Sequence, residues 1–182
     1  MNAPASLSPY SSATASSRAE RHTLSVLVDN EPGVLARVVG LFSGRGYNIE
    51  SLTVAEVAHV EHWSRITIVT NGSPEAIEQI SAQLERIVPI HKVTDLTVQG
   101  RSIEHELAMV KVAGRGDNRV EALRLADAFG ARVIDATLES FIFELTGSPE
   151  KIDDFVDLMR PIGLIELSRT GVAAISRGAE AV

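Results

Sequence analysis

One four-residue string occurs twice in this chain, and the repeat constrains the fold more than any other feature of the sequence. Gly72-Ser73-Pro74-Glu75 recurs as Gly147-Ser148-Pro149-Glu150, and an isoleucine follows two positions after the glutamate in both copies. Serine followed by proline and glutamate is typical of a helix start, with serine as N-cap and proline at the first helical position. The repeat therefore predicts two similar structural units in tandem.

The residues around each copy predict the same order of elements: strand, helix, strand, strand, helix, strand. Alternating apolar residues predict strands, and apolar residues three and four apart predict helices. For the first unit we expect strands at 22–28, 48–57, 63–70 and 90–98, and helices at 33–45 and from 73 to before Pro89. For the second we expect strands at 107–112, 132–135, 140–145 and 162–169, with helices around 122–129 and 150–159.

This order predicts an α+β protein made of two tandem ferredoxin-like βαββαβ units. Each unit should form an antiparallel four-stranded sheet with two helices on one face. We place the first domain at residues 21–99 and the second at 101–178, with the boundary in Gln99-Gly100-Arg101-Ser102. Residues 1–20 are rich in serine and alanine and have no apolar block, so they are expected to form a disordered tail and not a secretory signal.

Composition excludes several classes of function. The net charge of −7 argues against binding nucleic acid through a basic face. No apolar run approaches the roughly 18 residues of a membrane span, so we expect no membrane insertion and a cytoplasmic location. The chain has no cysteine, which excludes disulfides, thiolate metal sites and cysteine nucleophiles. Apolar residues make up 45% and aromatic residues only 4%, which predicts aliphatic cores.

The turn between the first strand and the first helix is the best candidate for a binding site. It reads Asp29-Asn30-Glu31-Pro32-Gly33-Val34-Leu35. A helix N-terminus has unpaired N–H groups and a partial positive charge, so a carboxylate can dock there. Gly33 has no Cβ to block that approach, and the Asn30 amide can both donate and accept hydrogen bonds. These residues are also ordinary turn and capping residues, so residue type alone does not separate the two interpretations.

The second unit differs from the first at this turn. It has Gly114-Arg115-Gly116-Asp117-Asn118, a looser turn with different chemistry. If the turn binds a ligand, only the first copy is expected to do so.

The sequence contains no recognisable catalytic constellation. His59 and His62 lie at an expected hairpin tip without further metal ligands nearby, and are interpreted as exposed loop histidines. Asp153, Asp154 and Asp157 fall on the polar side of a helix and are interpreted as a solvated face. No nucleophile elbow, phosphate loop or dinucleotide fingerprint is present. We therefore predict no catalytic residues and no metal site, as is typical of a binding or regulatory protein.

The turn and the residues beyond its helix closely resemble the small, regulatory subunit of acetolactate (acetohydroxyacid) synthase. The resemblance is carried by His22-Thr23-Leu24-Ser25-Val26-Leu27-Val28, Asn30-Glu31-Pro32-Gly33-Val34-Leu35-Ala36-Arg37-Val38 and Arg45-Gly46-Tyr47-Asn48-Ile49-Glu50-Ser51-Leu52. The last string is highly specific. The match continues through 64–68, 106–112 and 168–178, and therefore covers about residues 22–178.

The resemblance implies that the first unit is an ACT domain and the second an ACT-like domain. It further implies that two copies of the chain join their ACT sheets, and that valine binds between the turn of one chain and Asn48-Ile49 of the other. The implied effector-binding residues are Asn30, Gly33, Val34, Leu35, Asn48 and Ile49. Gly33, Val34 and Leu35 would offer backbone N–H groups to the carboxylate, Asn30 would hold the polar end of the ligand, and Ile49 would face its side chain.

The function implied by the resemblance is regulation of branched-chain amino acid biosynthesis. The second unit would help to bind and activate a separate catalytic large subunit, which carries thiamine diphosphate, Mg²⁺ and FAD, and none of these cofactors is expected in this chain. An alternative is a free-standing amino-acid sensor that acts on another enzyme or on transcription. Co-purification of a thiamine-diphosphate enzyme distinguishes the two.

Overall fold

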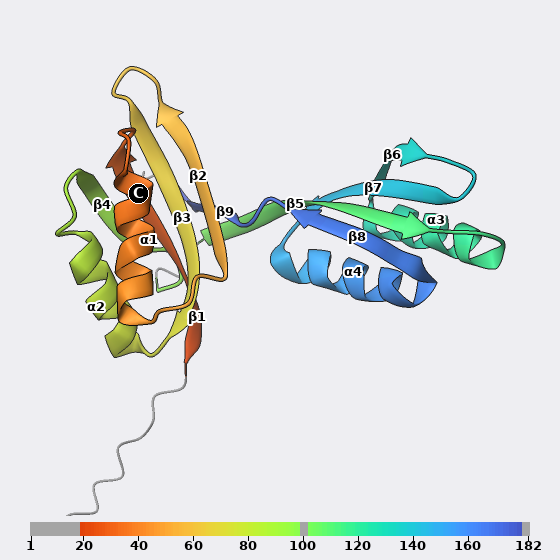
Figure 1. The fold of residues 1–182 in the computed structure, drawn as a ribbon, viewed down its shortest axis with the longest axis horizontal. Coiled ribbons are helices and arrows are strands. Elements are labelled where there is room, and N and C mark those ends of the chain that lie inside the picture. The colour runs from red at the N-terminus through yellow and green to blue at the C-terminus, as the bar shows by residue number, and fades with distance from the viewer. Residues whose placement is uncertain (1–18, 99–101, 180–182) are drawn as a thin grey trace, which may run out of the picture.

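The structure of the chain is a computed structural model, and it describes residues 19–98 and 102–179. The described residues form two βαββαβ units (Figure 1). The first unit consists of β1 (Glu20–Asp29), α1 (Val34–Arg45), β2 (Ser51–Ala58), β3 (Trp63–Gly72), α2 (Pro74–Leu84) and β4 (Ile90–Asp95). The second consists of β5 (Ser102–Ala113), α3 (Asp117–Phe129), β6 (Arg132–Ala136), β7 (Ser140–Gly147), α4 (Pro149–Gly163) and β8 (Leu164–Arg169), followed by β9 (Ala173–Ser176).

The two sheets have the same strand order. The first is β2-β3-β1-β4 and the second is β6-β7-β5-β8, and neighbouring strands in both are antiparallel. The first strand of each unit is thus central, and the two strands of the predicted hairpin lie together at one side. The predicted fold class, two tandem ferredoxin-like units with antiparallel sheets, is confirmed.

Each unit has its own core between its sheet and its two helices. In the first unit, alternate residues of β1 face the helices, and Val34, Val38 and Phe42 of α1 pack against them. The second core is more aromatic, since the ring of Phe143 on β7 packs edge-on against that of Phe155 on α4, with 6.2 Å between centroids. Burying one such side chain contributes roughly 1.5 to 3 kcal/mol, so the periodic apolar positions supply the main favourable contribution to the folding of each unit.

The repeated serine string starts the second helix of both units. The Ser73 side chain accepts a hydrogen bond from the Ala76 N–H at 3.3 Å, and the Ser148 side chain accepts one from the Lys151 N–H at the same distance. The two serines have extended backbones, and a proline follows each in the first turn. The predicted N-caps are therefore confirmed.

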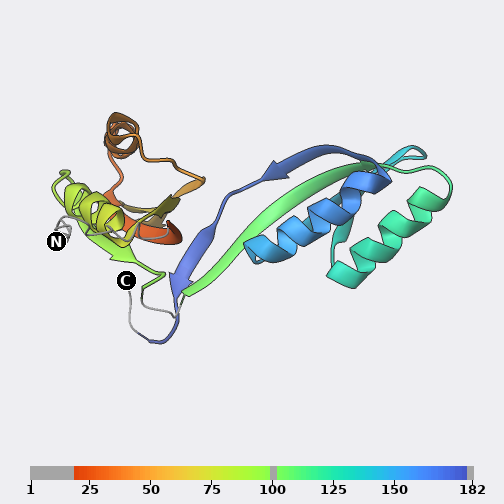
Figure 2. The same cartoon turned by 90° about the horizontal axis from the view of Figure 1, so that it is seen from below.

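The last strand, β9, was not predicted from the sequence. It pairs with the first part of β5, from Ser102 to His105, while the rest of β5 pairs with β7 and β8. Figure 2 shows the two strands running from the second unit toward the first. Val172 and Ala174 then pack against Val69 and Leu96 of the first unit, forming a third apolar cluster. Residues 172–176 thus return to the first domain.

Some predicted boundaries differ from the observed ones. Pairing in β2 begins at Ser51 and not at residue 48, because the preceding residues form the link that leaves α1. The strand predicted to reach residue 98 ends at Asp95, and α2 ends at Leu84, before Pro89. The predicted domain boundary at 99–101 lies outside the described residues, as does the predicted tail up to residue 18. Glu20 already belongs to β1, where it pairs with Gly72.

We predict that Ser73→Ala and Ser148→Ala each lower the free energy of unfolding by about 1 kcal/mol, because each leaves a helix N-terminus without its side-chain acceptor. Urea denaturation of the full chain measures this. Ser43→Ala, at an exposed position in α1, is the matched control and should change stability by less than about 0.5 kcal/mol. Equal effects for the caps and the control would contradict the capping role.

Candidate functional site

The turn before α1 forms a helix start with no side-chain cap. Gly33 is the N-cap residue, with a left-handed backbone (φ 88°, ψ −8°), and the first helical bond runs from the Arg37 N–H to the Gly33 carbonyl at 3.1 Å. The N–H groups of Gly33 and Leu35 precede this ladder, so no helical carbonyl accepts them. The Val34 N–H contacts the Glu31 carbonyl at 3.4 Å, which is a long hydrogen bond.

The charge at this helix start differs between the two units. The first turn of α1 has no acidic residue, whereas α3 begins with Asp117 after its own glycine N-cap, Gly116. A carboxylate in the first turn already complements the helix dipole. The α1 start is therefore the more favourable of the two for an external anion. This agrees with the expectation that only the first copy is built for a ligand.

Three other elements hold the turn in place. The Asp29 N–H donates to the Pro89 carbonyl at 3.1 Å, and the Asn30 N–H donates to the His62 carbonyl at 2.7 Å. The Asp29 carboxylate also contacts Nε2 of His91 at 2.5 Å, and the His91 ring packs 4.9 Å from that of Trp63. None of these supports was predicted. Two of them are hydrogen bonds to backbone carbonyls, which every residue has, so the amino-acid sequence does not indicate them.

Asn48 and Ile49 lie beyond the other end of α1. The helix ends at Gly46, which has a left-handed backbone, and the Tyr47 N–H donates to the Phe42 carbonyl at 3.0 Å. The Asn48 carbonyl then accepts a hydrogen bond from the Thr70 hydroxyl at 2.6 Å. Asn48 is exposed, and Ile49 is half-buried against the core of the first unit.

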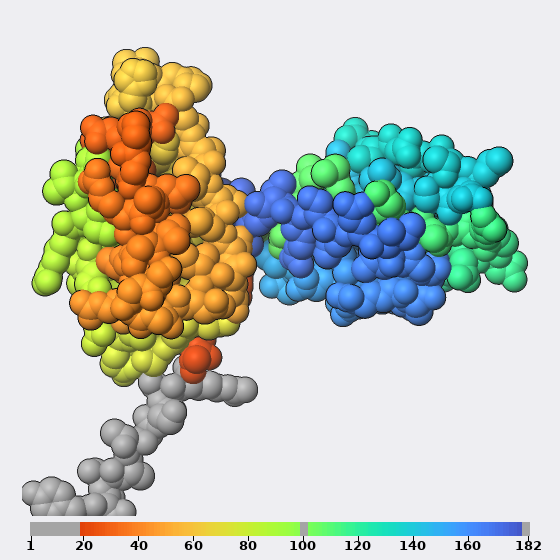
Figure 3. Space-filling view, viewed as in Figure 1, coloured from red at the N-terminus to blue at the C-terminus, as the bar shows by residue number. Residues whose placement is uncertain are grey.

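One protomer does not bring the predicted site residues together. Asn30, Gly33, Val34 and Leu35 lie at the N-terminus of α1, and Asn48-Ile49 follow its C-terminus. The helix has 12 residues, so its length is about 18 Å at 1.5 Å per residue. Figure 3 shows α1, in orange, along the visible face of the first unit. A free amino acid is too small to contact both groups within one chain.

The other candidate residues form no further site. His59 and His62 both approach the carboxylate of Glu56, at 3.2 and 3.6 Å, and their side chains are exposed. Asp153 and Asp157 lie on the exposed side of α4. Within residues 19–98 and 102–179, no group of three or more histidine, aspartate or glutamate side chains could hold a metal ion. No helix in the same ranges is long and apolar enough to cross a membrane.

Comparison with known proteins gives matches over both units. Residues 24–92 match the AHAS small subunit-like ACT domain, and residues 105–178 match the small subunit of acetolactate synthase. The chain is 45% identical to a probable acetolactate synthase small subunit of Archaeoglobus fulgidus over 158 residues, covering 87% of this chain and 98% of that protein. It is 42% identical to the acetolactate synthase isozyme 3 small subunit of Escherichia coli over 159 residues, covering 87% and 96%.

A solved structure agrees with these sequence matches. The crystal structure of the acetolactate synthase small subunit from Thermotoga maritima superposes with a TM-score of 0.80 and 35% sequence identity, covering 88% of this chain and 99% of that chain. The fold of the first unit and the glycine turn before its first helix define an ACT-domain protein. Within that class, the chain belongs to the acetolactate synthase small subunit family.

We predict opposite effects on stability for two glycine substitutions at α1. Gly33→Ala should lower the free energy of unfolding by about 1 to 2 kcal/mol, because its left-handed backbone is strained for any residue with a Cβ. Gly40→Ala, in the middle of α1 with nothing within 4 Å of the added Cβ, should raise it by about 0.5 to 1 kcal/mol. Urea denaturation measures both, and a stabilising Gly33→Ala would contradict the left-handed turn.

Proposed function

We propose that this chain is the non-catalytic regulatory subunit of an acetolactate synthase, in the biosynthesis of valine, leucine and isoleucine. It binds and activates a catalytic large subunit, and valine binding to its ACT domains inhibits the complex. The observation that carries this proposal is the family match, which spans both units and includes the open helix start at Gly33. Thiamine diphosphate, Mg²⁺ and FAD are expected in the catalytic subunit, and the effector of this chain is valine.

A two-fold pair of ACT domains completes the effector site in this proposal. Strand β2 is at the edge of its sheet, and Val54 and Val57 on it are 45% and 51% exposed. An open edge with exposed apolar residues favours pairing with another strand. In a two-fold dimer the same patch is used by both chains. In this proposal the two-fold axis is perpendicular to the sheet, so the two α1 helices run in opposite directions. The N-terminus of α1 in one protomer then lies beside the residues that follow α1 in its partner.

The chemistry of the two halves suits a branched amino acid. The N–H groups of Gly33 and Leu35 face a carboxylate without competition from a side-chain cap, and the exposed Asn30 amide is positioned by the hydrogen bond of its own N–H to His62. The half-buried Ile49 of the partner protomer offers an apolar surface to the ligand's side chain. Such a niche selects small aliphatic amino acids over charged ones.

Feedback inhibition requires that valine binding and activation of the catalytic subunit be coupled. In this proposal the small subunit alone favours the active state of its partner, and valine shifts the dimer toward a state that does not. The coupling free energy is typically about 1 to 3 kcal/mol, and it is reciprocal. The catalytic subunit therefore weakens valine binding by the same factor by which valine weakens activation.

Calorimetry of the isolated protein with valine, leucine and isoleucine tests the effector site. We expect valine to bind with one equivalent per chain, since a two-fold dimer has two identical niches. Size-exclusion chromatography with light scattering verifies that the sample is a folded dimer. The absence of binding heat with all three amino acids in such a dimer would contradict the proposed site.

Gly33→Asp tests the anion niche directly. We expect loss of valine inhibition with activation of the catalytic subunit retained, because a carboxylate fixed at the helix start repels that of valine. Gly33→Asn is the matched control, since it has the same size and is also tolerated in a left-handed turn but is uncharged. It should weaken inhibition less. Activity of the reconstituted complex with and without valine measures both, and loss of activation together with inhibition would show that the turn is only structural.

A further inference from the structure

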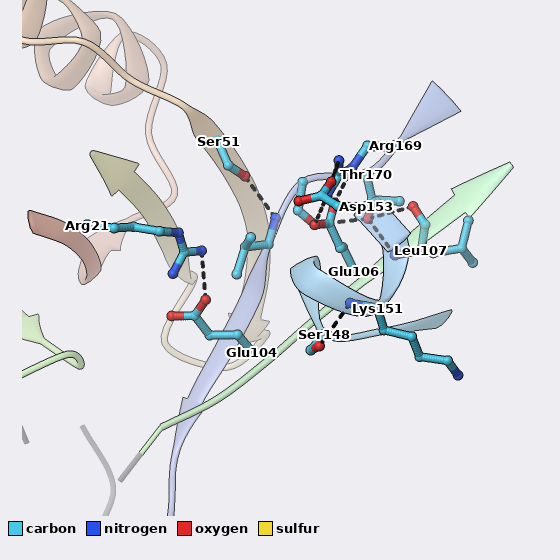
Figure 4. A network of polar contacts seen from close by, with 12 residues as sticks. Arg21, Ser51, Glu104, Glu106, Leu107, Ser148, Lys151, Asp153, Arg169 and Thr170 are labelled. Atoms are coloured by element: carbon cyan, nitrogen blue, oxygen red, sulfur yellow. Dashed lines mark hydrogen bonds and ion pairs between the residues drawn. The ribbon is translucent and has the colours of Figure 1, made fainter. Parts of the chain in front are cut away.

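The segment that follows the proposed effector residues is hydrogen-bonded to Val172, which lies between β8 and β9. The Ser51 hydroxyl accepts a hydrogen bond from the Val172 N–H at 2.8 Å, and the Thr53 hydroxyl donates one to the Val172 carbonyl at 2.8 Å. The two side chains of β2 thus hold both backbone groups of one residue from the second unit. Figure 4 shows the contact at Ser51. We call Ser51, Thr53, Gly171 and Val172 the clasp.

The clasp is closely fitted. Gly171 has a left-handed backbone (φ +85°), and a Cβ there would lie 2.7 Å from Oγ of Ser51 and 3.1 Å from Cγ2 of Thr53. Only glycine fits at this distance. The Val172 side chain is 3% exposed and packs with Val69 and Leu96. A buried apolar anchor beside two hydrogen bonds makes this a specific contact between the units.

The clasp is rigidly connected to the second unit. The Thr170 N–H donates to the Leu107 carbonyl on β5 at 3.0 Å. Arg169 donates to Glu106 on β5, including a bond of 2.8 Å, and to Asp153 on α4 at 2.6 Å. The Glu106 side chain is only 3% exposed, whereas that of Arg169 is 30% exposed, so the carboxylate of this pair is buried. Figure 4 shows Arg169, Glu106 and Asp153 together.

The clasp is equally well connected to the proposed effector site. Only Glu50 separates Ile49 from Ser51, and the Glu50 N–H donates to the Val69 carbonyl at 2.8 Å. The Asn48 carbonyl is held by Thr70, the next residue of β3. A displacement of Asn48 or Ile49 is therefore passed to Ser51 over a short backbone segment, and to Val172 through Val69 as well.

We propose that the clasp transmits effector binding from the ACT domain to the second unit, with Ser51 and Thr53 as positioning residues for regulation. This inference rests on the proposed function. Valine bound against Ile49 fixes residues 48–51 in one arrangement, and the clasp sets the position of residues 169–172 accordingly. Because Arg169 is bound to both β5 and α4, a shift there moves the second unit relative to the first. The coupling between valine binding and activation then depends on residues that contact neither valine nor the catalytic subunit.

A second contact between the units allows the clasp to be weakened without separating them. Arg21 on β1 and Glu104 on β5 form an ion pair of 2.7 Å. The apolar cluster of Val69, Leu96, Val172 and Ala174 also remains when the hydroxyls are removed. The double variant Ser51→Ala, Thr53→Val keeps nearly the same shape and loses only the two hydrogen bonds. It is therefore the sharpest test, and it is made on the full chain.

The experiment compares the wild-type chain, the double variant and the control Thr94→Val, each reconstituted with the catalytic subunit and assayed with and without saturating L-valine. Thr94 is a buried hydroxyl residue of the same sheet, on β4, and is 7% exposed. We expect only the double variant to lose inhibition. Its activities with and without valine should differ by less than about twofold, whereas allosteric coupling typically changes affinity by roughly 5- to 150-fold. Calorimetry of the isolated double variant should give a valine affinity within about twofold of wild type, since the niche itself is intact.

Hydrogen exchange adds a readout that is independent of activity. The Val172 amide should be protected in wild type and should exchange faster in the double variant, while the amides of β1 and β3 keep their protection. The double variant could show faster Val172 exchange and still be inhibited by valine as strongly as wild type. This result would overturn the proposed role of the clasp in regulation and leave the proposed function intact. A wild-type complex that does not respond to valine would overturn the proposed function, and this inference with it.

Discussion

The length of α1 is the constraint on which the account of regulation depends. The helix separates the glycine turn from Asn48 and Ile49 by its full 12 residues, or about 18 Å, so the two groups cannot contact one small ligand within one chain. If both bind valine, the ligand must lie between protomers. Valine binding and pairing of the ACT domains are then thermodynamically linked, and a change at the dimer interface is the natural first response to the effector.

The repeat places the same fold twice in this chain, with one clear difference between the copies. Both units begin their second helix with the same serine cap, and both sheets have the same strand order. They differ at the start of the first helix, where Gly33 is followed by no acidic residue and Gly116 is followed directly by Asp117. The common features stabilise each unit, whereas this difference leaves only α1 without a carboxylate in its first turn.

The fold could be predicted from the sequence because its signals are local. Alternating apolar residues such as Leu24, Val26 and Val28, and the two Ser-Pro helix starts, determine their elements through contacts within a few residues. The turn at Gly33 could also be predicted, since it lies at a change from strand to helix periodicity, and α1 begins there. Whether valine binds there remains a proposal, because the residues alone are compatible with a plain helix cap.

The contacts between the units could not be predicted, because they depend on pairing between distant residues. Ala173-Ala174-Ile175 is too short and too uniform to show strand periodicity, and it forms β9 only because β5 extends beyond its own sheet. Ser51 and Thr53 are ordinary strand residues until Val172 is placed beside them. In the same way, the supports of the turn at His62 and Pro89 are backbone carbonyls, which no residue type reveals.

The most direct test of the central claim, that two chains share each effector site, is valine binding by mixed dimers. Gly33→Asp damages one half of the niche and Asn48→Tyr fills the other half, so neither variant alone should bind valine. After the two are unfolded together and refolded, half of the dimers are mixed, and each mixed dimer has one intact niche of two. We expect recovery of about one quarter of the wild-type valine sites. No recovery in a demonstrably mixed population would contradict it, because the site would then lie within a single chain.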